Sequence, residues 1–150
     1  MKQYIIDSPI GSIGFQLEDD VIIATCFNPK YATSERINIP FQIEEKLNAY
    51  FHKKEPIVNL PIHLYGTSFQ RRVWEAIATI PFGHTVSYKQ LGDQIGSKAY
   101  QAIGQACGKN PIPLVIPCHR VIAHDGSLGG FSGGIEIKMK LLELEGIFFH

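Results

Sequence analysis

The middle of the chain reads SYKQLGDQIGSKAYQAIGQACG over residues 87–108. Ser87 followed three residues later by Gln90 is a capping box, so a helix is predicted to begin there. Gly96-Ser97 predicts a tight turn, and residues 98–108 predict a second helix. Two helices joined by a tight turn resemble a helix-turn-helix at about 87–108, a motif that holds DNA in some proteins and only builds a core in others.

The second predicted helix is rich in small residues, which allow another surface to approach closely: Ala99, Ala102, Gly104, Ala106 and Gly108. A glycine inside a helix costs roughly 1 kcal/mol, so two of them need a reason. One reason is close packing against another helix, and the other is insertion into a narrow groove of DNA. The spacing alone leaves both interpretations open.

On the N-terminal side, the pattern changes from helices to strands. Residues 2–26 hold short apolar runs between turn residues, which predicts a strand meander. Residues 41–52 place apolar side chains near helical spacing and predict one helix. Residues 53–65 carry two prolines and predict an extended connector.

Two further helices are predicted around the central pair. Thr67 with Gln70 is another capping box, and the residues after it form an apolar helix face. Residues 135–145 predict a last helix. The sequence therefore predicts an α+β fold with a β-rich lobe over 1–65 and a mostly α-helical lobe over 66–150.

The composition is that of a globular protein. Of 150 residues, 45% are hydrophobic and 19% are charged, which excludes a disordered or fibrous chain. Three cysteines without CxxC spacing argue against a disulfide framework and a cysteine-rich zinc site. The N-terminal residues lack the apolar core of a signal peptide, and no apolar run approaches membrane-spanning length. We therefore expect a cytoplasmic protein with no membrane partner and no structural metal.

The neutral net charge conceals an uneven distribution. Lysine plus arginine number 14, and aspartate plus glutamate number 14. Residues 1–65 hold six basic and eight acidic residues, residues 66–133 hold six and three, and residues 134–150 hold two and three. The middle of the chain is mildly basic at +3, so any contact with DNA phosphates is expected to depend only modestly on salt.

The segment IPCHRVI over residues 116–122 places a cysteine beside a histidine in what is predicted to be a rigid, extended stretch. A thiol attacks as the thiolate, and its usual pKa of about 8.5 must fall for reactivity at neutral pH. His119 is the obvious base for Cys118. Because adjacent side chains of an extended segment point apart, we expect a water to bridge the two groups.

Two other interpretations of this pair stay open. A lone cysteine beside a histidine is more often buried and inert than reactive. A zinc site fits less well, because adjacent ligands suit tetrahedral geometry poorly and no second pair of ligands lies nearby.

Two features follow the cysteine along the chain. A glycine cluster over residues 126–134 lacks the GxGxxG pattern of dinucleotide binding and predicts a tight loop whose backbone approaches a ligand. Glu145 ends the last predicted helix, where a carboxylate opposes the helix dipole. Glu145 therefore needs a compensating partner, for which a histidine is one candidate, or it is solvated.

Taken in order, these motifs resemble the O6-alkylguanine-DNA alkyltransferase family of single-turnover DNA repair proteins. The family's active-site motif is present as Pro117-Cys118-His119-Arg120-Val121. The match is dense over residues 66–146 and includes FQRRVW at 69–74, Ser87-Tyr88, Gly108 to Pro111, residues 132–134, Lys138, Leu141-Leu142 and Glu145-Gly146. Residues 1–65 match only in the style of the family's sheet-containing, ribonuclease H-like N-terminal lobe.

The resemblance implies a role for each residue that matches the motif. Cys118 is implied as the nucleophile, His119 as a base that acts through a water, and Glu145 as the group that orients the histidine, with the thiol ionised at neutral pH. Tyr88 is implied to donate a proton to guanine N3 and to meet the DNA backbone, and Asn110 to brace the active-site turn. The implied pocket residues are Val121, Phe131, Ser132 and Trp74, and the implied DNA contacts are Gln101, Lys98, Ala99 and Arg120.

The implied activity is repair of double-stranded DNA by direct transfer of an alkyl group, usually methyl, from O6 of guanine or O4 of thymine to Cys118. The target base is flipped out of the stack, the protein enters through the minor groove, and no cofactor takes part. The thioether product has no easy leaving path, so each molecule, acting as a monomer, reacts once. Two alternatives stay open: a non-catalytic protein of the same fold that recognises alkylated DNA, and a thiol hydrolase.

The sequence departs from the family pattern in the second central helix. Gln101 stands where the family usually has an arginine that fills the gap left by the flipped base. Glutamine can hydrogen-bond an orphan base, but it brings no charge and no cation–π stacking. The preceding turn, Gly96-Ser97-Lys98, is one residue short and lacks the usual proline. Both departures concern DNA affinity and base flipping rather than the transfer chemistry.

Overall fold

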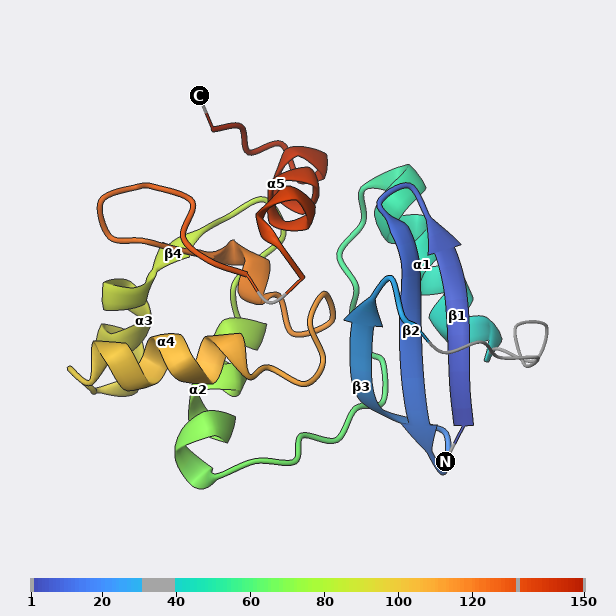
Figure 1. Ribbon diagram of the computed structural model, residues 1–150, viewed down its shortest axis with the longest axis horizontal. Coiled ribbons are helices and arrows are strands. Elements are labelled where there is room, and N and C mark those ends of the chain that lie inside the picture. Colours follow the sequence, from blue (N-terminus) through green and yellow to red (C-terminus); the bar gives the residue numbers. More distant parts are fainter. Residues whose placement is uncertain (1, 31–39, 132, 150) are drawn as a thin grey trace.

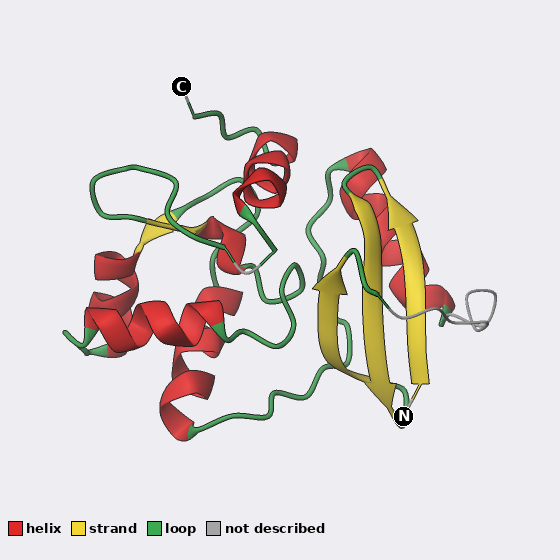
Figure 2. Ribbon diagram, viewed as in Figure 1, coloured by secondary structure: helices red, strands yellow, loops and turns green. Residues whose placement is uncertain are grey.

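The computed structural model describes residues 2–30, 40–131 and 133–149 (Figure 1). A three-stranded sheet and one helix lie on one side of the molecule, and the remaining helices lie on the other (Figure 2). The fold is α+β, as the sequence predicts. Buried apolar side chains from both sides belong to one core, so the two sides meet over a packed interface.

The sheet is an antiparallel meander of three strands in chain order: β1 (Lys2–Ser8), β2 (Gly11–Glu18) and β3 (Val21–Phe27). This confirms the meander predicted over residues 2–26. Tyr4 pairs with Phe15 and Ile6 pairs with Ile13, and all four side chains are buried. One face of the sheet therefore packs against the core.

Helix α1 (Phe41–Lys53) lies behind the sheet in Figure 1. Its buried residues are Ile43, Leu47, Tyr50 and Phe51, at positions i, i+4, i+7 and i+8 of one helical face. Lys54 adopts a left-handed conformation with φ 55° and ends the helix, one residue beyond the predicted end.

The connector after α1 is extended, as predicted, and it also pairs with the sheet. The amide of Ile22 donates to the carbonyl of Pro61 at 2.9 Å, and the amide of His63 donates to the carbonyl of Ile22 at 2.9 Å. These bonds hold the connector along β3. Proline is acceptable at this position because the connector lies at the edge of the sheet.

Helix α2 (Ser68–Ala78) begins with the predicted capping box, in which Thr67 and Gln70 each accept a hydrogen bond from the other's backbone amide. Its buried face includes Val73, Trp74 and Ile77. The indole N–H of Trp74 donates to the carbonyl of Ala106 at 2.8 Å and so fixes α2 against the next helical pair.

The helical pair consists of α3 (Tyr88–Ile95) and α4 (Tyr100–Gly108). Ser87 and Gln90 form the predicted capping box, and Gly96 ends α3 in a left-handed conformation with φ 71°. Helix α4 begins two residues later than predicted, because the hydroxyl of Ser97 accepts the amide of Ala99 and holds the turn open.

The remaining elements form the neighbourhood of the cysteine. Strand β4 (Val86–Ser87) pairs in parallel with β5 (Val121–Ile122), and the short 3-10 helix η2 (Cys118–Arg120) leads into β5. Helix α5 (Ile135–Leu144) buries Leu141 and Leu142. The predicted last helix is therefore present and ends one residue early.

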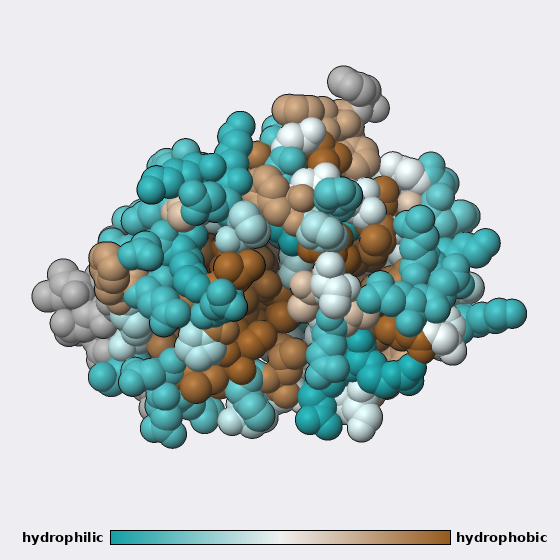
Figure 3. All heavy atoms as spheres, turned by 180° about the vertical axis from the view of Figure 1, so that it is seen from behind, coloured by the Kyte–Doolittle hydropathy of each residue, from teal (hydrophilic) through white to brown (hydrophobic). Residues whose placement is uncertain are grey.

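Hydrophilic and apolar residues are unevenly distributed over the rear surface of the molecule. Figure 3 shows the rear face, where hydrophilic residues form the rim and apolar residues gather toward the middle of the view. Among the helices that the structure describes, none combines the length and the apolar character needed to cross a membrane.

Candidate active site

Cys118 is the first residue of η2, so the segment around it is bent. The amide of Cys118 donates to the carbonyl of Ile116 at 2.7 Å, and the amide of Arg120 donates to that of Pro117 at 2.9 Å. The prediction of an extended segment here is wrong, because a single 3-10 turn separates Pro117 from β5. The turn directs Cys118 and His119 into different surroundings.

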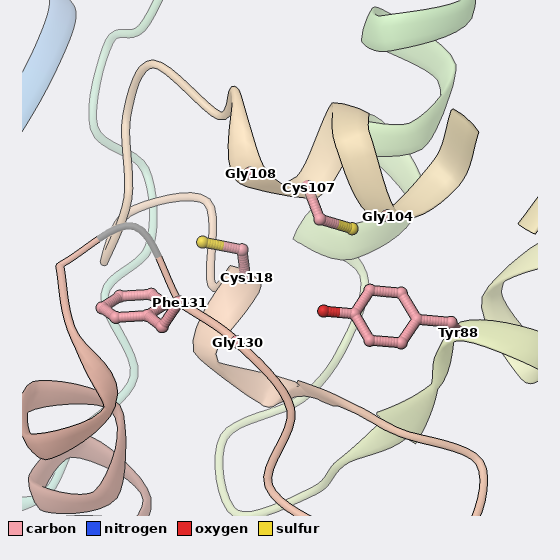
Figure 4. Close-up of a pocket in the computed structure, with 7 residues that line it drawn as sticks. All are labelled: Tyr88, Gly104, Cys107, Gly108, Cys118, Gly130 and Phe131. Carbon is pink, nitrogen blue, oxygen red and sulfur yellow. The ribbon is translucent and has the colours of Figure 1, made fainter. Parts of the chain in front are cut away.

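The Cys118 sulfur lines a cavity of about 180 Å³ between α4, the start of α3 and the glycine-rich loop. Figure 4 shows the residues around this cavity, with the Tyr88 hydroxyl and the Cys107 sulfur directed into it. A Cβ atom added at Gly104 or at Gly108 would meet no other atom within 4 Å. The small residues of α4 therefore leave the cavity open on that side.

His119, the residue after Cys118, meets Glu145 in the protein interior. Nε2 of His119 lies 2.6 Å from Oε2 of Glu145, and both side chains are fully buried. The carboxylate also accepts from Nε of Arg120 at 2.8 Å, from the hydroxyl of Tyr50 at 2.6 Å and from the amide of Gly83 at 3.0 Å. We call these five residues the Glu145 cluster. It supplies the partners that a carboxylate at a helix C-terminus requires.

The Glu145 cluster fixes the charge of its two central members. Burial raises the pKa of Glu145, but hydrogen bonds from His119 and Arg120 outweigh burial and lower it to about 2. Burial lowers the pKa of His119 below its usual 6.5, although Glu145 opposes the shift. At neutral pH the cluster therefore holds a carboxylate beside a neutral imidazole.

The neutral imidazole has one nitrogen left for chemistry. Because the carboxylate of Glu145 only accepts, Nε2 of His119 carries the proton. Nδ1 is the one buried side-chain nitrogen or oxygen that has no hydrogen-bond partner within the described ranges. A deprotonated nitrogen held in this way can take a proton from a nearby thiol, directly or through a water.

The Cys118 thiol is protonated at rest. Burial raises its pKa to about 11, while the Asn110 side chain and the charge of Lys138 lower it in part. The expectation of an ionised thiol at neutral pH is therefore wrong, because desolvation outweighs the neighbouring groups. A thiol in this protonation state needs a base before it can attack as a thiolate.

Asn110 fixes the loop that leads to the cysteine. Its amide nitrogen donates to the carbonyl of Ile116 at 2.8 Å, and its side-chain oxygen accepts the amide of Ile112 at 2.9 Å. These bonds close the loop just before η2. The structure thus brings Asn110, Cys118 and Tyr88 to one site, as the sequence motifs suggest.

Lys138 is a residue of the site that motif reasoning did not interpret. Its side chain is fully buried, and Nζ donates to the carbonyls of Val121 at 2.7 Å and Gly130 at 2.9 Å. Burial lowers the pKa of Lys138 to about 8. A lysine on the same helical face as Leu141, Leu142 and Glu145 was the available signal, since a buried lysine needs partners.

A family model described as 6-O-methylguanine DNA methyltransferase, DNA binding domain, matches residues 68–147. The chain belongs to this methyltransferase family. A methylated-DNA–protein-cysteine methyltransferase of Mycobacterium bovis is 50% identical over 102 residues, which is 67% of this chain and 62% of that relative. The corresponding protein of Mycolicibacterium paratuberculosis is 40% identical over 147 residues, covering 93% of this chain and 89% of the relative.

A solved methyltransferase structure has the same fold. The crystal structure of Mycobacterium tuberculosis OGT in complex with DNA is similar with a TM-score of 0.85 and 39% identity, and the match covers 95% of this chain and 91% of that chain.

Two residues assigned from the methyltransferase resemblance lie elsewhere than expected. Trp74 is 2% exposed and belongs to the core between α2 and α4 rather than to the pocket lining. Arg120 is 7% exposed and bonds to Glu145 and to the carbonyl of Ile80. A guanidinium held inside the protein in this way cannot reach a phosphate, so the predicted DNA contact of Arg120 is wrong.

The other assigned residues divide between the pocket and the surface. Phe131 lines the cavity and packs edge to face against His119, with ring centroids 6.5 Å apart. Val121 is fully buried, and its carbonyl accepts from Lys138. Ser132 lies outside the described residues. Lys98, Ala99 and Gln101 are exposed and line a shallow hollow at the start of α4.

Cys107 is a second thiol of the cavity that sequence reasoning missed. Burial raises its pKa to about 12, and the charge of Cys118 adds to the shift. The signal was its position three residues after Gly104 on the same helix face. Among the described residues, no group of three or more histidine, cysteine, aspartate or glutamate side chains is placed to hold a metal ion.

A second hollow, of about 750 Å³, shares Tyr88 with the thiol cavity as a lining residue. Its walls come from α3, the start of α4 and the loop after β5, and its charged residues are Lys89, Lys98 and Asp93. Two lysines and one aspartate thus face this hollow beside Tyr88.

Proposed function

We propose that this protein repairs DNA by transferring an alkyl group, usually methyl, from O6 of guanine to Cys118 in a single turnover. The observation that carries the proposal is a cysteine that lines an open cavity and is followed directly in the chain by a buried histidine paired with a glutamate. The same chemistry applies to O4 of thymine, which presents an equivalent alkylated oxygen.

The reaction moves one alkyl group and one proton. His119 Nδ1 accepts the thiol proton through a water, Sγ bonds to the alkyl carbon, and the bond from that carbon to O6 breaks. The electron pair returns to the base, and the Tyr88 hydroxyl donates a proton to guanine N3. The proton taken up by His119 then returns to the Tyr88 phenolate through water, so that in net terms one proton passes from Sγ to the base. Burial raises the pKa of Tyr88 to about 12, so Tyr88 holds a proton to give at neutral pH.

The chemistry explains why each molecule acts once. A thiolate is a soft nucleophile that attacks an alkyl carbon without a metal or a cofactor. The product is a thioether, and no group of the Glu145 cluster can displace it. The protein is therefore consumed by the reaction.

The DNA lies along α3 and α4 in this proposal. These helices act as a helix-turn-helix that enters the minor groove, with Lys98, Ala99 and Gln101 toward the duplex, and the target base flips into the cavity beside Cys118. Support comes from the exposure of these side chains and from the second hollow beside Tyr88, which Lys89 and Lys98 line.

The setting of the reaction is also proposed. The chain acts as a monomer in the cytoplasm, since a reducing compartment suits a protein whose chemistry needs a thiol. The β-rich lobe comprises residues 1–65, and the DNA-binding and alkyl-transfer lobe comprises residues 66–150.

One experiment separates this function from its alternatives. A duplex that carries O6-methylguanine with a labelled methyl group is incubated with the protein and with Cys118→Ala. Repair predicts label on Cys118 that stops at one equivalent, and none on the variant. Binding without label identifies a protein that only recognises lesions, and continued release of product identifies a hydrolase. Either of these two results refutes the proposal.

A further inference from the structure

Tyr50 belongs to the sheet side of the molecule, yet its hydroxyl reaches the carboxylate of Glu145. It lies on α1, is 1% exposed and donates to Oε2 at 2.6 Å. The two residues are 95 positions apart in the sequence. In the function proposed above, Glu145 holds His119, the general base. A residue on α1 therefore contacts the carboxylate that holds the general base.

Tyr50 and His119 share one oxygen atom, Oε2 of Glu145, and Nη2 of Arg120 also donates to that oxygen at 3.1 Å. Nε2 of His119 also lies 2.6 Å from Oε2 of Glu145. A carboxylate oxygen divides its negative charge among the donors that it accepts, so a second strong donor weakens the bond to the first. The Tyr50 hydroxyl therefore takes a part of the charge of Oε2 that would otherwise act on the imidazole of His119 and on Arg120.

The ring of Tyr50 is held in a fixed position. It packs edge to face against Phe51, with centroids 5.1 Å apart, and against Phe82, with centroids 5.8 Å apart. Burial and the charge of Glu145 raise the pKa of Tyr50 far above its usual 10. The hydroxyl thus keeps its proton and remains a donor at neutral pH.

We propose that Tyr50 is a positioning residue of the alkyl-transfer site, which acts through Glu145 to set the basicity of His119. The proposal rests on the function proposed above and gives the sheet side of the chain a part in the chemistry. The charged groups that act on His119 are Glu145, Arg120 and Lys138. Tyr50→Phe leaves all three in place, so a change at His119 reports the hydroxyl alone.

Nuclear magnetic resonance of the full chain with ¹⁵N-labelled histidine tests this directly. Tyr50→Phe removes one donor from Oε2, so Glu145 accepts more strongly from His119 and the Nε2 proton resonance moves downfield. Tyr4→Phe removes the hydroxyl of another buried tyrosine on the sheet side and serves as the matched control. A movement in Tyr50→Phe no larger than in Tyr4→Phe overturns the proposal.

A second replacement reverses the expected sign. Site-specific 3-fluorotyrosine at position 50 is a more acidic phenol and a stronger donor, so the His119 resonance moves upfield. A shift in the same direction as in Tyr50→Phe refutes the proposed coupling. This arm keeps the test decisive even where Tyr50→Phe folds poorly.

The pH profile of alkyl transfer provides the functional readout. A stronger bond to Glu145 raises the pKa of His119 in Tyr50→Phe, so the acid limb of the profile moves up by about half a pH unit, with duplex affinity unchanged. A limb that stays in place while only stability falls indicates a structural role and overturns the proposal. If the parent protein transfers no alkyl group, the proposed function fails, while the resonance comparison still decides the role of Tyr50.

Discussion

Cys118 holds its proton tightly, since burial raises the pKa of its thiol to about 11, and the neighbouring imidazole is neutral. A protonated thiol reacts slowly with electrophiles, so this combination lowers the reactivity of Cys118 toward small reagents. It also places the burden of activation on His119, whose Nδ1 is unpartnered among the described residues. The resting site thus pairs a protonated thiol at Cys118 with a neutral imidazole at His119.

Alkylation of Cys118 by iodoacetamide should follow this protonation state. In a Cys26→Ala, Cys107→Ala background, the rate should rise about tenfold per pH unit through the alkaline range, because the thiolate fraction grows by that factor below the pKa. The measurement is the mass of the modified protein with time at each pH. A plateau below pH 8 would show that the thiol is ionised at rest.

Asn110→Ala should destabilise the protein and slow alkyl transfer. The change leaves the carbonyl of Ile116 and the amide of Ile112 without their partners, which costs about 1–3 kcal/mol of unfolding free energy. Urea denaturation and the single-turnover rate measure the two effects. Asn48→Ala, at an exposed site on α1, is the control and should change neither, and equal behaviour of the two variants would contradict the role of Asn110.

Helix α4 carries two functions on two faces. Gly104, Cys107 and Gly108 line the thiol cavity, whereas Gln101, Ala102 and Gln105 line the shallow outer hollow. Small residues serve both faces, since they open the cavity inside and allow close approach outside. The glycines of α4 lower the stability of the helix, but they leave the thiol cavity open.

Gly104→Ala should separate stability from activity. The new Cβ meets nothing within 4 Å, so the unfolding free energy should rise by roughly 0.5–1 kcal/mol, while the narrower cavity slows alkyl transfer. Gly92→Ala on α3 is the contrast, because its Cβ would lie 2.6 Å from the carbonyl oxygen of Ser97 and should lower stability. Thermal unfolding and single-turnover rates measure both variants. Faster alkyl transfer by Gly104→Ala than by the parent protein would refute the idea that the open side of the cavity at Gly104 admits the substrate.

Gln101→Arg should tighten binding to duplex DNA. The new guanidinium adds charge at an exposed position on the outer face of α4, and one added phosphate contact steepens the dependence of log Kd on log salt by about 0.9. Fluorescence anisotropy at several salt concentrations measures this. Gln42→Arg on α1 adds the same charge on the sheet side, and an equal gain there would mean that Gln101 does not face DNA.

The molecule as a whole is stabilised by a cluster that crosses between its two sides. Glu145 on the helical side is held by Tyr50 on the sheet side, and Thr25 of β3 bonds to the carbonyls of Pro111 and Pro113 in the loop that precedes Cys118. The loop and the carboxylate that define the site are thus both anchored to the sheet side. Stability and reactivity share these contacts.

Acid should therefore destabilise the protein through the site itself. The pKa of Glu145 is about 2 in the folded state against 4.5 in the unfolded chain, so its stabilisation is complete above pH 4.5 and is lost as the pH falls toward 2, by roughly 3 kcal/mol. The lowered pKa of His119 acts in the same direction below pH 6.5. Urea denaturation across this range measures the slope, and Glu145→Gln should flatten it. Identical pH slopes of the unfolding free energy in the parent protein and in Glu145→Gln would contradict the lowered pKa assigned to Glu145.

Local signals predicted much of the fold. The capping boxes at Thr67 and Ser87 marked two helix starts correctly because the bonds involved span three residues. The start of α4 was missed by two residues, since the Ser97 hydroxyl holds the turn, and the bend at Cys118 was missed because its Pro117-led turn carries no distinctive pattern.

The site was predictable only in part, because burial is a property of the whole fold. The dipole argument at Glu145 suggested a histidine partner, and the structure brings His119 to it. Tyr50 and Cys107 gave no motif, and their roles depend on contacts between distant segments. Trp74 and Arg120 were misplaced for the same reason, since nothing in their local sequence says which way the helix and the turn face.

The ammonium of Lys138 joins β5, through the carbonyl of Val121, to the glycine-rich loop, through the carbonyl of Gly130, which lines the thiol cavity. Enclosed in this way, it is sheltered from amine-reactive mass tags that label surface lysines. Its labelling requires an opening of the structure that breaks the bonds to Val121 and Gly130. The rate at which Lys138 acquires a tag in chemical footprinting would therefore measure how often the structure around the thiol cavity opens, without any engineered reporter.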